Sequence, residues 1–241
     1  MLVVTGTGTG VGKTVVTAAI AALARARGWS VVVVKPVQTG VAPGEAGDLA
    51  EVARLTGVGS TVELARYAAA LSPAAAARIA GEPPVDVGGI VRRIRDESTS
   101  DLVLVEGAGG LLVRYDDEGS TIASVAYETK APLVVVIEPG LGTLNSTALT
   151  LEAMAHRGLQ LAGLVIGAWP AEPDLACRSN IRDLEMLAAR PLDGALPAGA
   201  ARLSPAAFAA MAATALGPAF GGHFDAADFR SRHDPARRFR S

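Results

Sequence analysis

The stretch that decides the fold reads Leu2-Val-Val-Thr-Gly6-Thr-Gly-Thr-Gly10-Val-Gly-Lys13-Thr14. A short β-branched run leads into the glycines, and an Ala-rich helical stretch follows them. Glycines between a strand and a helix let backbone N–H groups turn toward phosphate oxygens, and the helix N-terminus adds its dipole. The pattern predicts a phosphate-binding loop in which Lys13 reaches the β and γ phosphates and the Thr14 hydroxyl binds Mg²⁺. The loop is one residue longer than the standard pattern, because Thr7 occupies the position of its first glycine.

Short apolar runs alternate with helical stretches along the rest of the chain. The runs lie at 2–5, 31–34, 102–105, 133–137 and 161–166, with a weaker one at 192–196. They are apolar at every position, as strands buried on both faces of a sheet are. Helix candidates lie at 13–27, 48–56, 73–80, 86–96, 121–129, 143–157, 174–189 and 205–216. This order predicts an α/β fold of the P-loop NTPase type, with a mainly parallel sheet and helices on both faces.

Composition excludes several classes of protein. The 241 residues are 50% hydrophobic, enough for a sizeable core, and the net charge of -2 offers no field for nucleic acid or an anionic membrane. A single cysteine, Cys177, excludes an intrachain disulfide and a four-cysteine zinc site. No signal-peptide pattern and no run of membrane-spanning length is found. We therefore expect a soluble, cytoplasmic protein without nucleic-acid or membrane partners.

The last residues differ from the rest of the chain. Residues 222–241 hold five arginines and three aspartates. We expect a single domain over residues 1–220, followed by a charged tail over 221–241 that is solvated or only partly ordered. The alternative is a docked segment, because Phe224, Phe229 and Phe239 would otherwise be exposed.

Only three of the 22 basic residues are lysines, namely Lys13, Lys35 and Lys130. Lysine is a compact charge that fits between oxygens where a planar guanidinium does not. Lys35 ends the second apolar run, at the sheet edge where α/β proteins bind ligands, and Pro36-Val-Gln-Thr39-Gly40 follows it. We expect Lys35 in the site and a Lys35→Ala variant that folds but is nearly inactive. Thr39 either adds a hydroxyl to the site or only stabilises the turn.

Three further features mark the same edge of the predicted sheet. Glu106 ends the third apolar run before Gly-Ala-Gly-Gly, which resembles the Walker B arrangement, where the acid holds a metal ion directly or through water. Asp48 is equally well explained as a helix N-cap and as a metal ligand. The turn Gly140-Leu-Gly-Thr-Leu144-Asn145 either binds a carboxylate through its amides or is a simple cap.

Taken together, these elements resemble the dethiobiotin synthetase family, whose members close the ureido ring in biotin biosynthesis. The match runs in family order from residue 2 to about residue 200. The resemblance implies an ATP-dependent cyclo-ligase that converts 7,8-diaminononanoate and CO2 to dethiobiotin through a carbamate and a carbamic-phosphoric anhydride. It also implies Mg²⁺, ATP or another nucleoside triphosphate such as CTP, and a homodimer with its sites at the interface.

The resemblance also assigns residues. Lys13 and Lys35 would be catalytic, and Thr14, Asp48 and Glu106 would hold Mg²⁺. The diamine would contact Thr9, Lys35, Thr39 and Gly109, with Leu144 and Asn145 supplied by the second subunit. The nucleotide would contact a larger set: Gly10, Val11, Gly12, Lys13, Thr14, Val15, Asp48, Glu106, Gly107, Ala108, Gly109, Gly167, Ala168, Pro197, Ala198 and Gly199.

Two departures bear on specificity, and one on the class of protein. Some family members carry an acid at the position of Gly10. This chain has no carboxylate there and so lacks that contact to the substrate amine. Many carry an Asn that reads adenine where this chain has Gly167, so we expect weak base selectivity and a Gly167→Asn variant that prefers ATP. The alternative reading is a regulatory ATPase of the ParA and MinD type, but the signature lysine of those proteins would fall at Gly8.

Overall fold

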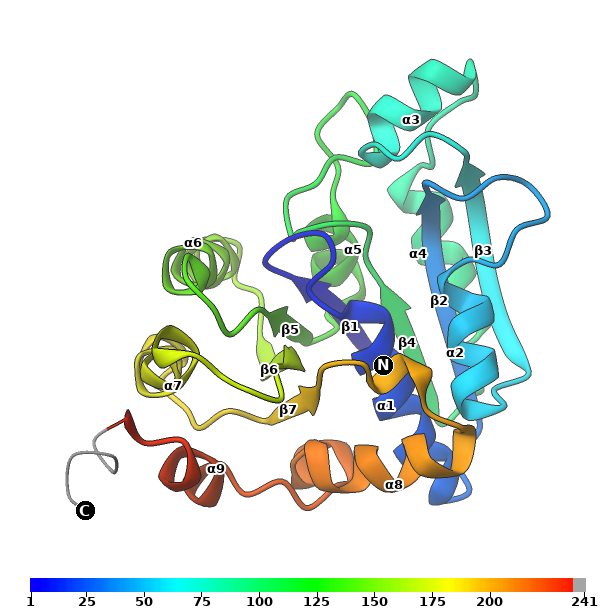
Figure 1. Cartoon of the computed structure of the whole chain (residues 1–241). Coiled ribbons are helices and arrows are strands. Elements are labelled where there is room, and N and C mark those ends of the chain that lie inside the picture. The colour runs from blue at the N-terminus through cyan, green and yellow to red at the C-terminus, as the bar shows by residue number, and fades with distance from the viewer. Residues whose placement is uncertain (236–241) are drawn as a thin grey trace.

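The structure, a computed structural model, describes residues 1–235, and within them seven strands form one parallel sheet in the order β3-β2-β4-β1-β5-β6-β7 (Figure 1). The strand bounds are β1 Leu2–Gly6, β2 Val31–Thr39, β3 Ser60–Tyr67, β4 Leu102–Glu106, β5 Leu133–Ile137, β6 Leu161–Trp169 and β7 Gly194–Pro197. Parallel strands need crossover connections, and helices supply them here. The predicted α/β, P-loop-type architecture is confirmed.

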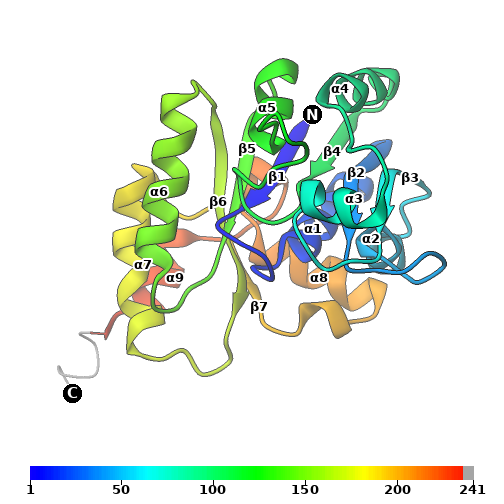
Figure 2. The same ribbon diagram turned by 90° about the horizontal axis from the view of Figure 1, so that it is seen from above.

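Helices cover both faces of this sheet (Figures 1 and 2). The helices of one face are α1 Lys13–Ala26, α2 Asp48–Thr56 and α8 Pro205–Ala215. Those of the other are α4 Val87–Asp96, α5 Ile122–Thr129, α6 Thr143–His156, α7 Leu175–Ala188 and α9 Ala226–Arg232. α3 Pro73–Ala80 packs against β2 and β3. In both views α6 and α7 lie side by side at one end of the sheet, with α2 and β3 at the other.

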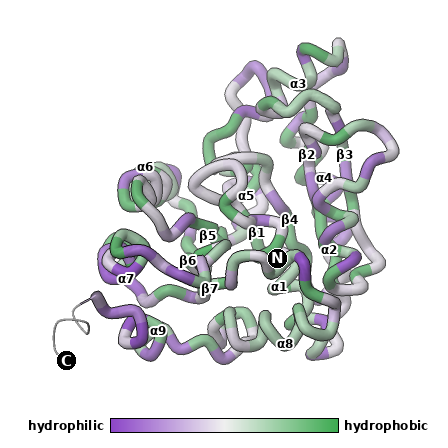
Figure 3. The backbone as a smooth tube through the Cα atoms, viewed as in Figure 1, coloured by the Kyte–Doolittle hydropathy of each residue, from purple (hydrophilic) through white to green (hydrophobic). Residues whose placement is uncertain are grey.

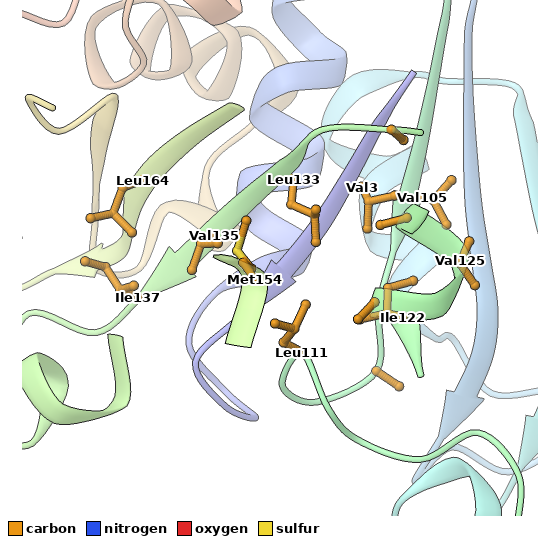
Figure 4. Close-up of a cluster of buried hydrophobic side chains, with 14 of the residues drawn as sticks. Val3, Val105, Leu111, Ile122, Val125, Leu133, Val135, Ile137, Met154 and Leu164 are labelled. Atoms are coloured by element: carbon orange, nitrogen blue, oxygen red, sulfur yellow. The ribbon is translucent and has the colours of Figure 1, made fainter. Parts of the chain in front are cut away.

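Strand periodicity explains why the core is divided into two layers. Neighbouring residues on a strand point to opposite faces, so Val3 packs into one apolar cluster and Val4 into the other. On β5, Leu133, Val135 and Ile137 join the cluster drawn in Figure 4, and Val134 and Val136 the opposite one. Each such side chain contributes about 1.5–3 kcal/mol when fully buried. Packing on both faces therefore holds the sheet in place, and the sheet in turn fixes the residues at the ends of its strands.

The eight helices predicted from the sequence are all present, shorter by at most one residue at each end. The excess residues are caps. Asp86, Thr121 and Asp174 each accept a hydrogen bond from the first turn of the helix that follows, without being helical themselves. The helix bounds were thus predicted well because capping residues are visible in the sequence.

Three strands were predicted less well, and one of them is β6, which continues past 166 to Trp169. β3 was missed because it is an edge strand whose residues are mostly half-exposed and therefore form no apolar run. β2 does not end at Lys35 but continues through Pro36 to Thr39. Pairing with β4 stops at Val34, so one side of β2 is free beyond that point and tolerates a residue without an N–H group. As a result, residues 36–39 extend β2 beyond Lys35 at the carboxyl edge of the sheet.

The C-terminal region is docked as far as the structure describes it. α9 carries mostly hydrophilic residues (Figure 3), yet Phe229 is only 5% exposed and its ring packs edge-on against Trp169 at 4.9 Å. Arg230 pairs with Glu185 on α7, and Arg182 of α7 contacts Asp234 at 3.2 Å. Residues 221–235 therefore follow the docked alternative rather than the solvated tail, because their aromatic side chains find an apolar surface. Phe239 lies outside the described residues.

Candidate active site

The loop between β1 and α1 has the backbone of a phosphate-binding loop. Gly10 and Gly12 have φ angles of +81° and +98°, which side chains other than glycine rarely adopt. A Cβ atom on Gly12 would also lie 2.8 Å from the carbonyl oxygen of Gly167 on β6. The loop is therefore held against the end of β6, and the N-terminus of α1 faces the space above it.

Lys13 is folded back onto this loop. Its Nζ donates a hydrogen bond to the carbonyl oxygen of Gly8 at 2.7 Å. Burial lowers the pKa of Lys13, and the nearby charge of Lys35 lowers it further, against the opposing effect of Glu106 and Asp48. A partly desolvated ammonium gains strongly from an anion, so phosphate oxygens are suited to replace the Gly8 carbonyl.

Lys35 and two carboxylates form a compact buried cluster next to the loop. The Nζ of Lys35 lies 2.6 Å from Asp48 Oδ2 and 2.7 Å from Glu106 Oε1. The hydroxyl of Thr14 donates to the same Glu106 oxygen at 2.8 Å. Burial alone lowers the pKa of Lys35, but the two carboxylates outweigh it and hold the pKa above its usual value. The two carboxylates thus favour the charged form of Lys35.

The oxygen atoms around Lys35 fit a magnesium ion. Glu106 is 1% exposed, and its Oε2 has no hydrogen-bond partner among the described residues. Mg²⁺ in phosphoryl-transfer sites takes one or two carboxylates, a hydroxyl and phosphate oxygens. Glu106, Asp48 and Thr14 supply such a donor set. Within residues 1–235 no cluster of three or more His, Cys, Asp or Glu that could hold a metal ion is found.

These groups lie in a cleft of about 730 Å³ at the carboxyl edge of the sheet. Most of the predicted residues line it, namely Thr9, Gly10, Gly12, Lys13, Thr14, Val15, Lys35, Thr39, Asp48, Glu106, Ala108 and Gly109. The sequence reasoning missed the other lining residues, which are Val37, Gln38, Val41, Ala70, Leu71, Ser72, Pro73 and Val113. Position on the extended part of β2 could have revealed Val37 and Gln38. No signal in the sequence marks the others, because they reach the cleft through loops and α3.

The predicted base-binding residues lie outside the lining of this cleft. Gly167 and Ala168 are on β6, and β7 lies beside it, with Pro197 opposite Trp169. The N–H of Ala198 donates to the carbonyl oxygen of Trp169 at 2.7 Å, which ties the two segments together. Val11 and Gly107 are buried and do not line the cleft. Lys130, the C-cap residue of α5, does not line it either.

A side chain at Gly167 would clash with the phosphate loop. A Cβ atom there would lie 1.9 Å from the carbonyl oxygen of Val11 and 2.7 Å from a methyl group of Val136. The expectation that a Gly167→Asn variant would prefer ATP is therefore wrong. The phosphate loop occupies the space that the amide would need, so the substitution displaces the loop instead of adding a contact.

Leu144 and Asn145 do not line the cleft of their own chain. They begin α6, and Asn145 is exposed. Leu141, just before the helix, is 88% exposed, and Leu149 on the same helix is also exposed. Asn145 and Leu149 are four residues apart on α6 and therefore lie on the same side of this helix.

Comparison with known proteins identifies the family. A family described as "AAA domain" matches residues 1–202. The ATP-dependent dethiobiotin synthetase BioD of Frankia casuarinae is 62% identical over 97% of this chain and 98% of its own length. The protein of the same name from Streptomyces coelicolor is 54% identical over 98% of this chain and 99% of its own. The chain belongs to the dethiobiotin synthetase family. The predicted class of enzyme, a ligase of biotin biosynthesis, is thereby confirmed.

Solved structures show how far the fold extends beyond the dethiobiotin synthetase family. A ParA family ATPase from Chlorobium tepidum matches with a TM-score of 0.54 at 15% identity, over 87% of this chain and 90% of that one. The septum site-determining protein MinD of Pyrococcus horikoshii matches with a TM-score of 0.50 at 17% identity, over 81% and 79%. At these identities the likeness shows the fold alone. Within residues 1–235 no helix is both long and apolar enough to cross a membrane.

Proposed function

We propose that the cleft converts 7,8-diaminononanoate, CO2 and a nucleoside triphosphate to dethiobiotin, a nucleoside diphosphate and phosphate. The observation that carries this proposal is the position of Lys35. Its ammonium contacts two carboxylates, one of which also accepts a hydrogen bond from the Thr14 hydroxyl, and it lies beside a phosphate loop whose lysine is available for an anion. Such a site suits a reaction in which an anionic oxygen attacks the γ-phosphate.

The proposed chemistry proceeds in three steps. One amine of the substrate attacks CO2 and loses a proton to water, which gives a carbamate. A carbamate oxygen then attacks the γ-phosphorus, the bond to the β-phosphate oxygen breaks, and the nucleoside diphosphate leaves. The second amine attacks the carbonyl carbon of the mixed anhydride and loses a proton to water, and phosphate leaves as the ring closes. Each step places negative charge near Lys13 and Lys35, which favours preorganised cations over acid–base groups.

The remaining roles follow from position in the cleft. Mg²⁺, when bound by Thr14, Asp48 and Glu106, would supply charge neutralisation at the β and γ phosphates. Thr39 and Thr9 line the cleft beside Lys35 and are suited to contact the diamine. Gly10 also lines the cleft, and a Cβ atom there would meet nothing within 4 Å. An acidic side chain would therefore have space at this position. Its backbone, however, would have to adopt a positive φ angle, which residues other than glycine disfavour. The substrate amine therefore lacks a carboxylate partner at residue 10.

The enzyme would be a homodimer in which Leu144 and Asn145 complete the neighbour's site. The support is the exposure of two leucines near them in the single chain, Leu141 just before α6 and Leu149 on it. Burying these side chains against a second copy would bring the α6 N-terminus to the partner's cleft.

Product analysis tests this function directly. The protein is incubated with diamine, bicarbonate, Mg²⁺ and each of ATP, CTP, GTP and UTP in turn, and dethiobiotin is measured by mass spectrometry. We expect dethiobiotin with wild-type protein and none with a Lys13→Ala variant. Nucleotide hydrolysis without dethiobiotin would contradict the proposal and favour a regulatory ATPase.

A further inference from the structure

Gln38, which lines the cleft, joins β2 to the start of α2 through a hydrogen bond. It is buried on the extended part of β2, three residues after Lys35. Its Oε1 accepts a hydrogen bond from the backbone N–H of Asp48 at 2.9 Å, and its Nε2 donates to the carbonyl oxygen of Thr39 at 3.2 Å. We propose that Gln38 is a positioning residue that holds Asp48 in place for Lys35 and for Mg²⁺ bound with the nucleotide.

Asp48 depends on such support more than its partners do, because its side chain is the most exposed of the three. The Asp48 side chain is 34% exposed, whereas those of Lys35 and Glu106 are almost fully buried. Packing therefore locks the lysine and the glutamate but not the aspartate. The place of the Asp48 carboxylate is set by its ion pair with Lys35 and by where its backbone enters α2, and ligands that are held loosely bind metals poorly.

The helix that Asp48 begins has no cap of its own. The N-cap residue of α2 is Gly47, which has no side chain to accept a hydrogen bond from the first turn. The amide oxygen of Gln38, on β2, supplies part of this capping by accepting the hydrogen bond from the Asp48 N–H. Without it the Asp48 N–H would lose its partner, and the start of α2 would be free to shift away from Lys35.

The loop before Asp48 is held from the next strand as well. Arg66 on β3, which lies opposite Gln38 in the sheet, donates from Nη1 to the carbonyl oxygens of Glu45 at 2.8 Å and Ala42 at 3.3 Å. Glu63 fixes the other side of the Arg66 guanidinium. A Cβ atom on Gly47 would lie 2.8 Å from Gln38 Oε1 and 2.9 Å from Arg66 Nη2, so both side chains close over that glycine.

The inference rests on the proposed function only in taking Asp48 as part of a Mg²⁺–nucleotide site. The same amide also holds the carbonyl of Thr39, so it couples a proposed substrate contact to a proposed metal ligand. Loss of the amide should therefore weaken the Mg²⁺-dependent part of nucleotide binding and leave the Mg²⁺-independent part, made by the phosphate loop, in place.

The test compares Gln38→Leu with Thr56→Val. Thr56 donates to the carbonyl oxygen of Val52 at 2.7 Å at the far end of α2, so its loss disturbs the same helix without touching the cleft. Binding of ATP is measured by calorimetry with excess EDTA and over a Mg²⁺ titration. For Gln38→Leu we expect the Mg²⁺ concentration at half-maximal enhancement to rise about tenfold or more. We expect affinity in EDTA to stay within about twofold, and no such shift in Thr56→Val.

Hydrogen exchange supplies a readout that does not depend on nucleotide. The Asp48 amide should lose protection in Gln38→Leu and keep it in Thr56→Val. If Gln38→Leu does not fold, Gln38→Asn replaces it, since the shorter side chain keeps the amide but cannot span the distance to Asp48. The same Mg²⁺ shift is expected there.

Three results would overturn the inference. One is an unchanged Mg²⁺ midpoint in folded Gln38→Leu or Gln38→Asn, and another is an equal shift in Thr56→Val. The third is wild-type binding that does not depend on Mg²⁺, because Asp48 would then hold no metal. Wild-type protein that binds Mg²⁺–nucleotide yet makes no dethiobiotin would instead defeat the proposed function and leave the role of Gln38 intact.

Discussion

Lys35 stabilises the fold as well as serving the proposed chemistry. The sequence suggested a lysine with little packing, so that Lys35→Ala would fold normally. In the structure Lys35 is buried against Glu106, with Asp48 on its other side. Breaking a buried pair by removing one partner typically costs about 3–5 kcal/mol, because the other charge stays behind.

A Lys35→Met variant is therefore expected to lose both activity and stability. Turnover should fall about a hundredfold or more, as for removal of other preorganised charges. The free energy of unfolding, from urea titration, should fall by about 3 kcal/mol. Adding Glu106→Gln should recover part of that stability but none of the activity. Wild-type stability in Lys35→Met alone would show that the Lys35–Glu106 pair contributes nothing to the fold.

Lys13 behaves in the opposite way, since its lowered pKa means that its charged form is less favourable in the folded chain than in the unfolded one. Its contribution to stability is present above the ordinary pKa of 10.5 and is lost as pH falls through the lowered value. At pH 7 the Lys13 charge thus opposes folding. Lys13→Met should melt higher than wild type at pH 7, and the gap should close as pH approaches 10.5. Added nucleotide should raise the melting temperature of wild type only. A variant that melts lower at every pH would contradict this.

The close packing of Gly167 against the phosphate loop predicts how nucleotide affinity responds to a substitution there. Gly167→Ala should weaken binding of ATP, CTP, GTP and UTP alike, because the added methyl group pushes on Val11 of the phosphate loop. Ala168→Ser, at the exposed neighbouring position, should bind all four as wild type does. Wild type should discriminate among bases weakly, since one absent hydrogen bond forgoes about 1 kcal/mol. A wild-type preference for ATP of several orders of magnitude would mean that backbone groups near Gly167 or Pro197 read the base.

Elements with a strong local signal were predictable, and those defined by context were not. The Gly-rich turn after β1 and the capped helices follow from residue chemistry that acts within a few positions. β3 is stabilised by pairing with β2 across 25 or more residues, and its Glu63 and Arg66 look like surface charges in the sequence. α9 likewise depends on Trp169, which lies far away in the sequence.

The docking of α9 should depend on pH through His233. Its ring packs against Trp169 at 4.8 Å and Phe229 at 4.7 Å. Burial lowers the pKa of His233 below its ordinary 6.5, helped by the charges of Arg232 and Arg178. The stability it contributes is therefore present above pH 6.5 and is lost as pH falls through the lowered value.

Fluorescence of Trp169 can follow this docking. The sequence contains two tryptophans, so a Trp29→Phe background leaves Trp169 as the reporter. We expect a change in its emission as pH falls below 6.5, absent in His233→Leu and retained in His223→Gln, whose histidine is exposed. An identical pH profile in His233→Leu would assign the change to another group.

The order of strands in the sheet brings together site residues that lie far apart in the sequence. β1, β2 and β4 are neighbours although their sequences lie up to 100 residues apart, so Lys13, Lys35 and Glu106 meet at one edge. Motif order and parallel strands were enough to predict this meeting. The approach of Gln38 to Asp48 was not predictable, because it depends on where β2 ends and how the loop returns.

The proposed dimer makes the final prediction, because each site would then use residues of two chains. Lys13→Ala disables the phosphate loop of its own chain, and Asn145→Ala disables the turn lent to the neighbour. In a mixed dimer one site carries both defects and the other carries neither. Equal mixing of the two inactive proteins, with subunit exchange, should restore about a quarter of wild-type activity, since half of the dimers are mixed and one of their two sites is intact.

The control is a mixture of Lys13→Ala with Lys35→Ala. Both lysines belong to the same chain's part of the site and line one cleft. Each site of that mixed dimer therefore keeps one defect, and no activity should return. Exchange is verified by native mass spectrometry of tagged subunits before turnover is measured. A mixture of Lys13→Ala and Asn145→Ala that exchanges subunits yet stays inactive would place Asn145 outside the neighbour's site, and a fully active monomer would remove the dimer from the mechanism.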